Sequence, residues 1–274
     1  MSCASSWSPA IINGTATLTN LPWKITTKQL EDKFYTSKVS LLNDLEAMAY
    51  GMIYLKSKDF IELNPHAKQQ KGTIGVIAAG TGLGEAILYY DGTQYHPLAT
   101  EGSHSDFAPC TKQQDKLLEW LRVKYPDHVS YERVISGEGI SNIYNFLVNS
   151  NFALECDLMK NISKEVDKNE MITKCALNLN DKLSLETLRL FLEIYGAEAG
   201  NLALKSMGIG GILIGGGIAP KILPLINNGV FLNSFIKKGR FESLLKDISI
   251  KVVLNEQTAL LGSARYAYDK IIGA

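Results

Sequence analysis

The chain has 274 residues, of which 46% are hydrophobic and 20% charged, and its 28 basic and 28 acidic side chains cancel at neutral pH. This length can bury the core of one large or two modest domains, and the balanced, dispersed charges argue against a nucleic-acid or anionic-membrane partner. We also expect a cytoplasmic protein with reduced thiols, because the sequence shows no apolar run of roughly 20 residues, no secretory signal pattern and no CxxC pair among its four cysteines.

The first predicted elements are short. An Asn-Gly turn inside residues 11–20 predicts a hairpin, and Thr26 to Gln29 fit a capping box ahead of a helix that runs through Phe34. Residues 38–42 are predicted to form a short strand that ends at Asn43-Asp44, and residues 45–55 a helix.

The middle of the chain predicts a buried strand followed by a hairpin. Residues 75–79 are continuously apolar, as is typical of a strand inside a sheet. The pair Asp91-Gly92 predicts a turn between strands at 85–90 and 93–98. Apolar side chains at helical spacing then predict helices at 112–123 and around 140–147.

The last third alternates helices and strands. A long helix is predicted at 185–207, a strand at 211–214, a triple-glycine turn leading into a helix, a strand at 248–254 and a final helix at 258–272. Because strands and helices alternate and glycine turns twice join them, the fold class is α/β.

Asp44 is the candidate catalytic base. It lies where a predicted strand gives way to a helix, a common place for site residues in α/β proteins. A carboxylate there could orient a hydroxyl and accept its proton. The alternative is that it serves as a helix N-cap, a position that favours Asn and Asp.

Gly80-Thr81-Gly82, within the run GTGLG, is the candidate phosphate turn. It follows a buried strand but leads into a hairpin, so it is neither a dinucleotide-binding turn nor a P-loop. Its backbone N–H groups and the Thr81 hydroxyl could surround a phosphate. The alternative is a tight turn that simply requires small residues.

Glu101 and His104 are candidate ligands for sugar hydroxyls. A carboxylate accepts hydrogen bonds, whereas a neutral imidazole can both donate and accept, so the pair suits neighbouring hydroxyls. The alternative is a surface loop in which His104 pairs with Asp106. Glu132 would be a further hydroxyl acceptor, or alternatively a salt-bridge partner of Arg133 or another basic residue.

Gly215-Gly216-Gly217 joins a strand to a helix, and its bare backbone would let a flat adenine ring approach. A simple strand-to-helix turn is the alternative.

The order of these motifs resembles that of the bacterial glucokinase family, from about residue 11 to the C-terminus. The matching runs are LNDLEA, GTGLG, EGSHSDFAP, ERVISGEG, AGNLAL, GGGI and LLGSA. The resemblance implies a two-domain actin-like ATPase (ribonuclease H-like) fold with ATP and sugar in the interdomain cleft. Residues 1–55 and 256–274 would form the small domain and 56–255 the large domain.

By this resemblance the chain is a glucokinase that uses ATP with Mg²⁺, and a homodimer is possible. Glucose would contact Asn43, Asp44, Glu101, His104 and Glu132, with Asp44 as base. Gly80, Thr81 and Gly82 would form the second phosphate loop, and Gly215, Gly216 and Gly217 would lie beside the adenosine.

Three departures from the family pattern carry expectations. Thr100 and Ser103 stand where glycines are usual and are expected to narrow the sugar pocket, while Glu138 replaces a common proline with little effect. The Asp-x-Gly-Gly-Thr run of the first phosphate loop does not occur in the sequence. We therefore expect an incomplete small domain, low stability and weak or no kinase activity, with a non-catalytic sugar-binding remnant as the alternative function.

Overall fold

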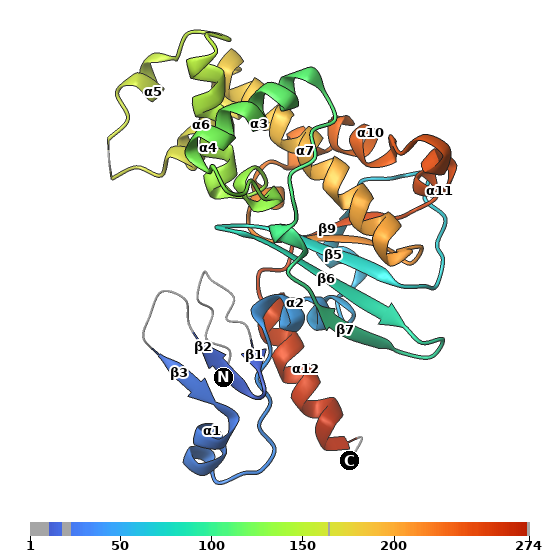
Figure 1. Cartoon of the computed structure of the whole chain (residues 1–274). Coiled ribbons are helices and arrows are strands. Elements are labelled where there is room, and N and C mark those ends of the chain that lie inside the picture. Colours follow the sequence, from blue (N-terminus) through green and yellow to red (C-terminus); the bar gives the residue numbers. More distant parts are fainter. Residues whose placement is uncertain (1–10, 18–22, 164, 273–274) are drawn as a thin grey trace.

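Two β-sheets and the helices around them make up the fold, which a computed structural model describes for residues 11–17, 23–163 and 165–272 (Figure 1). The larger sheet has six strands in the order β4-β9-β8-β5-β6-β7. The strands β5, β8 and β9 pair in parallel, and the other pairings are antiparallel. Their bounds are β4 Phe60–Glu62, β5 Ile74–Ala79, β6 Leu83–Tyr90, β7 Tyr95–Ala99, β8 Gly211–Gly215 and β9 Ile250–Val253.

One face of the large sheet is covered by a helical layer built around α7 (Lys182–Ser206). Side chains from this helix, its neighbours and the sheet form the main hydrophobic core. The other helices of the layer are α3 (Lys112–Lys124), α4 (Gly137–Asn149), α5 (Asp157–Lys160), α6 (Lys168–Leu179), α8 (Ile218–Lys221), α9 (Leu223–Ile226), α10 (Val230–Ile236) and α11 (Glu242–Lys246). Within the described residues, no helix combines the length and apolar character needed to cross a bilayer.

The opposite face of the large sheet carries α2 (Asp44–Met52), which in turn packs against α12 (Thr258–Ile272). Leu45, Ala49 and Met52 of α2 form a second core with residues of β5, β6, β8 and β9. The backbones of the two helices are in direct contact at Gly262, where an added Cβ would collide with the Ala47 carbonyl.

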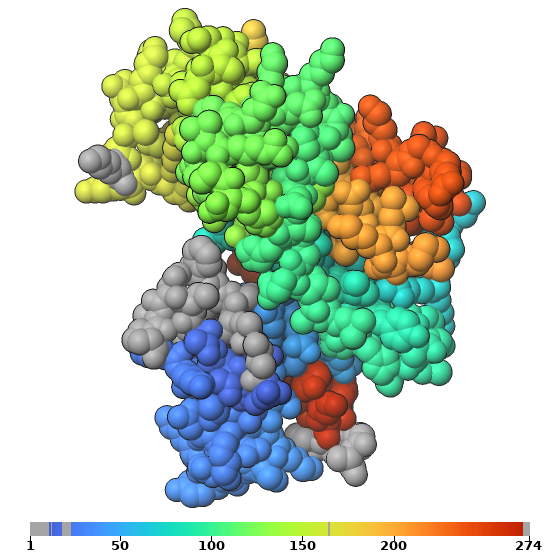
Figure 2. Space-filling view, in the orientation of Figure 1, coloured from blue at the N-terminus to red at the C-terminus, as the bar shows by residue number. Residues whose placement is uncertain are grey.

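The smaller sheet contains β1 (Ile11–Ile12), β2 (Thr15–Thr17) and β3 (Lys24–Thr26), and is followed by α1 (Thr27–Phe34). Asn13 and Gly14 both have positive φ, as the predicted hairpin turn requires. Figure 2 shows this N-terminal segment in blue at the opposite end of the molecule from the green and yellow-green helices α3 to α6.

Most predicted elements are confirmed within a few residues, including the capping box, in which the Thr26 hydroxyl accepts from the Gln29 N–H. The strand predicted at 38–42 is wrong: these residues carry no regular structure. A strand requires a hydrogen-bonding neighbour, and no strand in the described part of the chain pairs with them. The helix expected after the triple-glycine turn is present but only four residues long.

Candidate active site

The glycine turn joins β5 to β6 and closes on itself. The Gly80 N–H donates to the Gly82 carbonyl at 2.8 Å, and the Gly80 carbonyl accepts from the Gly137 N–H at 2.8 Å. The turn therefore lies against the start of α4, whose N-cap is Ser136. Thr81 is exposed, and a Cβ on Gly80 would meet nothing within 4 Å. The turn thus offers accessible backbone beside a helix N-terminus, which suits a negatively charged group.

Glu132 is bound to this turn. Its Oε2 accepts from the Leu83 N–H at 3.0 Å, across 49 residues of sequence. The alternative pairing with Arg133 is not what the structure shows, since the Arg133 guanidinium lies 2.6 Å from Glu138 instead. Glu138 also bonds Tyr125 and lies 3.2 Å from Lys124. The half-buried carboxylate of Glu132 is therefore held at the edge of the glycine turn.

Asn43 and Asp44 begin α2. Asn43 is the N-cap, and its Oδ1 accepts from the Leu45 N–H at 2.8 Å. Asp44 occupies the first helical position, and its Oδ1 accepts from the same N–H at 2.8 Å. Asn43 thus occupies the N-cap position that was the alternative for Asp44, and the two side chains share the Leu45 N–H. The Leu45 side chain lies against Gly84, which brings the start of α2 next to the glycine turn.

Residues 100–104, named here the Glu101 loop, follow β7 and contain the 3₁₀ turn Gly102–His104. Glu101 and His104 are both exposed on it. The Thr100 hydroxyl donates to the Glu85 carbonyl at 2.9 Å and accepts from the Gly102 N–H at 3.2 Å. A Cβ on Gly102 would collide with Glu85 Oε2, so the loop lies directly on the Glu85 side chain.

Two side chains in and beside the Glu101 loop, Ser103 and Asp106, bear on its alternatives. Glu101 and His104 are exposed, as the surface-loop alternative expects, but the partner found for Asp106 is His128, at 3.1 Å, and not His104. Ser103 is buried, and the Thr100 hydroxyl hydrogen-bonds to the backbone of Glu85 and of Gly102. That these two side chains narrow a sugar pocket stays a prediction.

The triple-glycine turn lies beside the end of β5. Gly216 has a φ of 81°, and a Cβ there would collide with the Ala79 carbonyl. Glycine is therefore required by both conformation and close approach. A Cβ on Gly217 would meet nothing within 4 Å, so the backbone there is open, as an approaching flat ring requires.

The structure therefore gathers four segments, far apart in sequence, around residues 79–85. Glu132 bonds Leu83, the start of α2 packs on Gly84, the Glu101 loop rests on Glu85 and Gly216 packs on Ala79. Sequence reasoning missed Glu85, although a carboxylate between the apolar neighbours Gly84 and Ala86 of a buried strand was a usable signal.

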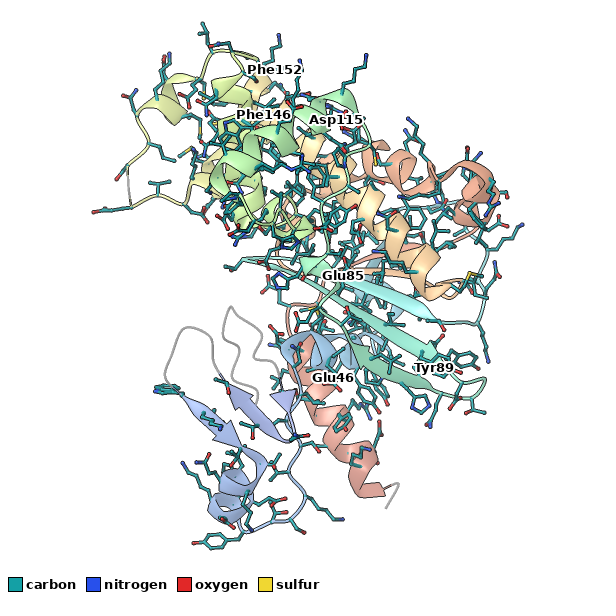
Figure 3. The ribbon with its side chains drawn as sticks, in the orientation of Figure 1. Glu46, Glu85, Tyr89, Asp115, Phe146 and Phe152 are labelled. Atoms are coloured by element: carbon teal, nitrogen blue, oxygen red, sulfur yellow. The ribbon has the colours of Figure 1, made fainter. Side chains whose placement is uncertain are left out.

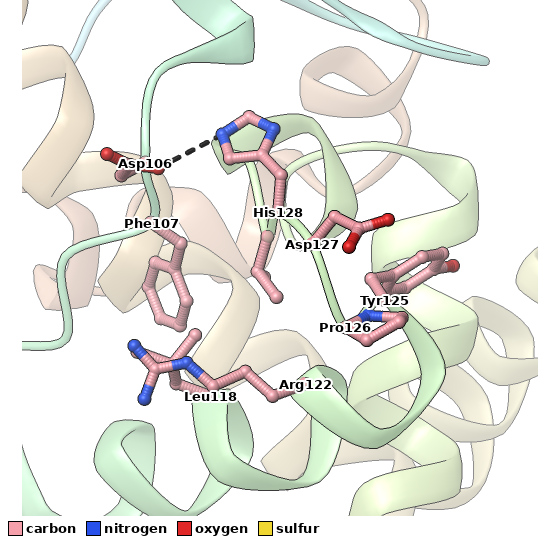
Figure 4. Close-up of a pocket in the computed structure, with 9 residues that line it drawn as sticks. Asp106, Phe107, Leu118, Arg122, Tyr125, Pro126, Asp127 and His128 are labelled. Carbon is pink, nitrogen blue, oxygen red and sulfur yellow. Dashed lines mark ion pairs between the residues drawn. The ribbon is translucent and has the colours of Figure 1, made fainter.

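Two other features bear on ligands. Within the described ranges, no cluster of three or more His, Cys, Asp or Glu side chains could hold a metal ion. A separate surface hollow lies between the segment after the Glu101 loop and α3, and it contains the Asp106–His128 pair and Arg122 (Figure 4). It includes none of the predicted site residues.

Comparison with known proteins gives a consistent result. The profile of a family described as Glucokinase matches residues 3–270. The glucokinase of Trichormus variabilis is 42% identical over 266 residues, covering 93% of this chain and 78% of the relative. The crystal structure of a glucokinase from an Antarctic psychrotroph superposes with a TM-score of 0.81 at 29% identity, covering 95% of this chain and 78% of that one. A glucokinase from Balamuthia mandrillaris, solved in complex with glucose, has a TM-score of 0.75 at 20% identity, covering 95% and 75% of the two chains.

Proposed function

The chain belongs to the glucokinase family, the ATP-dependent hexose kinases with an actin-like ATPase fold, and from this premise we propose how its own residues carry out the transfer. The γ-phosphoryl group of ATP passes to the 6-hydroxyl of glucose, giving glucose 6-phosphate and ADP at the entry to glycolysis. The observation that carries the proposal is the 3.0 Å hydrogen bond between Glu132 and Leu83. It joins a candidate sugar ligand to the candidate phosphate turn, so that acceptor and donor substrates would meet there.

Asp44 acts as the base. It lies in the first turn of α2, where the helix dipole favours the charged carboxylate. A phosphoryl transfer needs the attacking oxygen in line with the γ-phosphate and needs its proton removed as the new bond forms. A carboxylate within hydrogen-bond reach of the 6-hydroxyl does both.

The sugar is held by hydrogen bonds of both polarities. The carboxylates of Glu101 and Glu132 accept from hydroxyls, the His104 ring can donate or accept, and the Asn43 amide group can donate. A site that pairs each hydroxyl rejects sugars that lack one, because a buried polar group is then left unpaired. Glucose is therefore the expected substrate among the hexoses.

ATP is held by backbone. The turn Gly80-Thr81-Gly82 takes the phosphates, and Gly215, Gly216 and Gly217 lie beside the adenosine. Mg²⁺ arrives with the nucleotide, since nucleotide-bound Mg²⁺ is held largely by phosphate oxygens and water and the described residues offer no metal cage of their own. When bound, it neutralises charge on the phosphates.

The domain grouping and the setting complete the proposal. The packing of α2 on α12 supports assigning residues 1–55 and 256–274 to one domain and 56–255 to the other. We also propose a cytoplasmic location, from the cysteine and signal patterns of the sequence, and the family resemblance makes a homodimer possible, which size-exclusion chromatography with light scattering tests.

The testing experiment is a coupled assay for glucose 6-phosphate with ATP, Mg²⁺ and glucose. We expect Asp44→Ala to lower kcat by about 10²–10⁴-fold, the usual contribution of a general base. Asp115→Ala is the matched control, because Asp115 is likewise in the first turn of a helix but lies exposed on α3, away from the site (Figure 3).

An Asp44→Ala enzyme that keeps wild-type kcat contradicts the assignment of the base. A wild-type chain that binds glucose in calorimetry yet forms no product favours the sugar-binding remnant over the kinase.

A further inference from the structure

A buried pair of carboxyl groups lies directly beneath the Glu101 loop. Glu85 on β6 is 2% exposed and Glu198 on α7 is fully buried. Figure 3 shows Glu85 inside the molecule, where the sheet meets the helical layer. Neither residue has a role in the transfer described above, and burying a carboxylate is costly unless it is paired.

The two carboxyl groups have unequal partners. Glu198 Oε1 lies 3.2 Å from the Lys205 ammonium, and its Oε2 accepts from the Asn201 amide at 2.8 Å. Glu85 Oε1 has no hydrogen-bond partner. Glu198 is thus paired with a cation and an amide, whereas one oxygen of Glu85 has no partner, so the charged form of Glu85 is the one that burial disfavours.

Burial, and then the like charge of Glu198, raise the pKa of Glu85 to about 8, with Lys205 acting in the opposite direction. The other titratable groups around the pair are Tyr195 of α7, Tyr131 of the 3₁₀ turn Tyr131–Arg133, and Lys238 after α10. Burial raises the pKa of both tyrosines and lowers that of Lys238.

The pair touches both elements that carry the proposed sugar ligands. The Glu101 loop rests on Glu85 Oε2 through Gly102 and is tied to the Glu85 carbonyl through Thr100. On the other side, the Asn201 amide donates both to Glu198 at 2.8 Å and to the hydroxyl of Tyr131, the residue before Glu132, at 3.1 Å. A change of charge at Glu85 would therefore act on the position of the loop.

We propose that Glu85 is a positioning residue for the sugar: its buried carboxyl group, kept protonated beside the Glu198 carboxylate, supports the Glu101 loop in the conformation that binds glucose. This inference rests on the proposed function, because it takes Glu101 and His104 as sugar ligands. Ionisation of Glu85 puts a second negative charge beside Glu198 and displaces the carboxyl group or the loop above it. Glucose then binds with a coupled uptake of one proton.

The test is calorimetric titration of glucose, without nucleotide, between pH 7 and pH 9. If only the protonated form is competent, the wild-type Kd becomes roughly tenfold weaker at pH 9 than at pH 7. Repeating the titration at pH 9 in buffers of different ionisation enthalpy should reveal about one proton taken up per glucose. In Glu85→Gln, which stays neutral, we expect a Kd that does not change with pH and no proton uptake.

Two further variants sharpen the result. Glu198→Gln removes the like charge, so ionised Glu85 no longer faces a second carboxylate and glucose binding should weaken less between pH 7 and pH 9 than in the wild type. Glu193→Gln, on the same helix but paired with Arg189 at 3.4 Å, should keep the wild-type pH dependence. If Glu85→Gln does not fold, the inference is still tested by the proton uptake of the wild type on glucose binding and by the pH dependence of the Kd in Glu198→Gln.

A wild-type Kd that is equal at pH 7 and pH 9, or an unchanged pH dependence in Glu85→Gln, overturns the inference while leaving glucose binding intact. A wild-type chain that binds no glucose at pH 7 overturns the proposed function as well. In the coupled assay, Glu85→Gln should alter the pH dependence of KM for glucose but leave kcat at saturating glucose near the wild-type value, a split that general damage to the fold would not produce.

Discussion

Glu132 combines two tasks at one side chain, since the carboxylate that is proposed to bind sugar also satisfies the backbone N–H of buried Leu83. In Glu132→Ala this N–H loses its acceptor, which typically costs about 1–3 kcal/mol. We expect the free energy of unfolding in urea to fall by that amount and KM for glucose to rise.

Glu132→Gln separates the two tasks. The Gln carbonyl can still accept from Leu83, so stability should return towards the wild-type value, while KM stays raised because the charge is lost. If Glu132→Ala unfolds at the same urea concentration as the wild type, the hydrogen bond to Leu83 contributes nothing to stability.

At the residue scale, the sequence indicated which residues belong to the candidate site better than it indicated the residues to which they hydrogen-bond. The Asn-Asp pair at the start of α2 was recognised, but which of the two caps the helix depends on side-chain geometry that spacing does not encode. Glu132 was named as a candidate, whereas its partner Leu83, 49 residues away, could not be. Glu85 and Glu198 were missed because a buried carboxyl pair arises only when β6 and α7 pack together.

At the element scale, the crossing of α2 and α12 depends on glycine. A Cβ on Gly262 would collide with the Ala47 carbonyl, which cannot move without disturbing α2. Overpacking of this kind usually costs about 1–3 kcal/mol. We therefore expect Gly262→Ala to lower the melting temperature clearly in a calorimetric scan.

Ser263→Ala is the control for that scan, because it alters the next residue of α12 without adding volume, and it should melt close to the wild type. Equal melting temperatures for Gly262→Ala and the wild type would mean that the helices separate at little cost, contrary to the close contact described above.

Elements with local signals were predicted well. The Asp91-Gly92 turn, the apolar run of β5 and the helical periodicity of α3 and α4 each specify structure within a short window. Residues 38–42 have a strand-like composition, but a strand depends on a neighbour that composition does not supply. The same reason explains why the short edge strand β4 was not predicted and why the order of the strands in the large sheet was not either.

At the scale of the whole molecule, Glu85 links stability to pH. Its pKa is about 8 in the folded state and near 4.5 when the chain is unfolded, so folding favours the neutral acid. Below pH 4.5 the group is protonated in both states, so it does not make the free energy of unfolding depend on pH. Between pH 4.5 and 8 the free energy of unfolding falls as the pH rises, and above pH 8 this dependence ends. Glu85→Gln has no such group, so its stability relative to the wild type should increase as the pH rises. We expect this increase in the difference between the two free energies of unfolding to be on the order of 4 kcal/mol from pH 4.5 to pH 8.5.

Urea unfolding of both proteins at the two pH values measures this difference, and using a difference cancels the other titrating groups. A constant difference would show that Glu85 ionises in the folded protein as it does in the unfolded one. The same curves give the absolute stability of the chain, for which the expectation of a low value stays a prediction.

The pairing of early with late segments also has a consequence for how the molecule is made. β4 and α2 lie within residues 44–62, yet their partners β9 and α12 lie within 250–272. At a synthesis rate of about 5–20 residues per second, α2 would emerge on the order of 10–40 s before the segments that cover it. During that interval the apolar face formed by Leu45, Ala49 and Met52 is without β9, one of the strands on which it packs. The nascent chain therefore carries uncovered apolar surface for the whole of this interval, and its risk of aggregation falls only once β9 and α12 have been made.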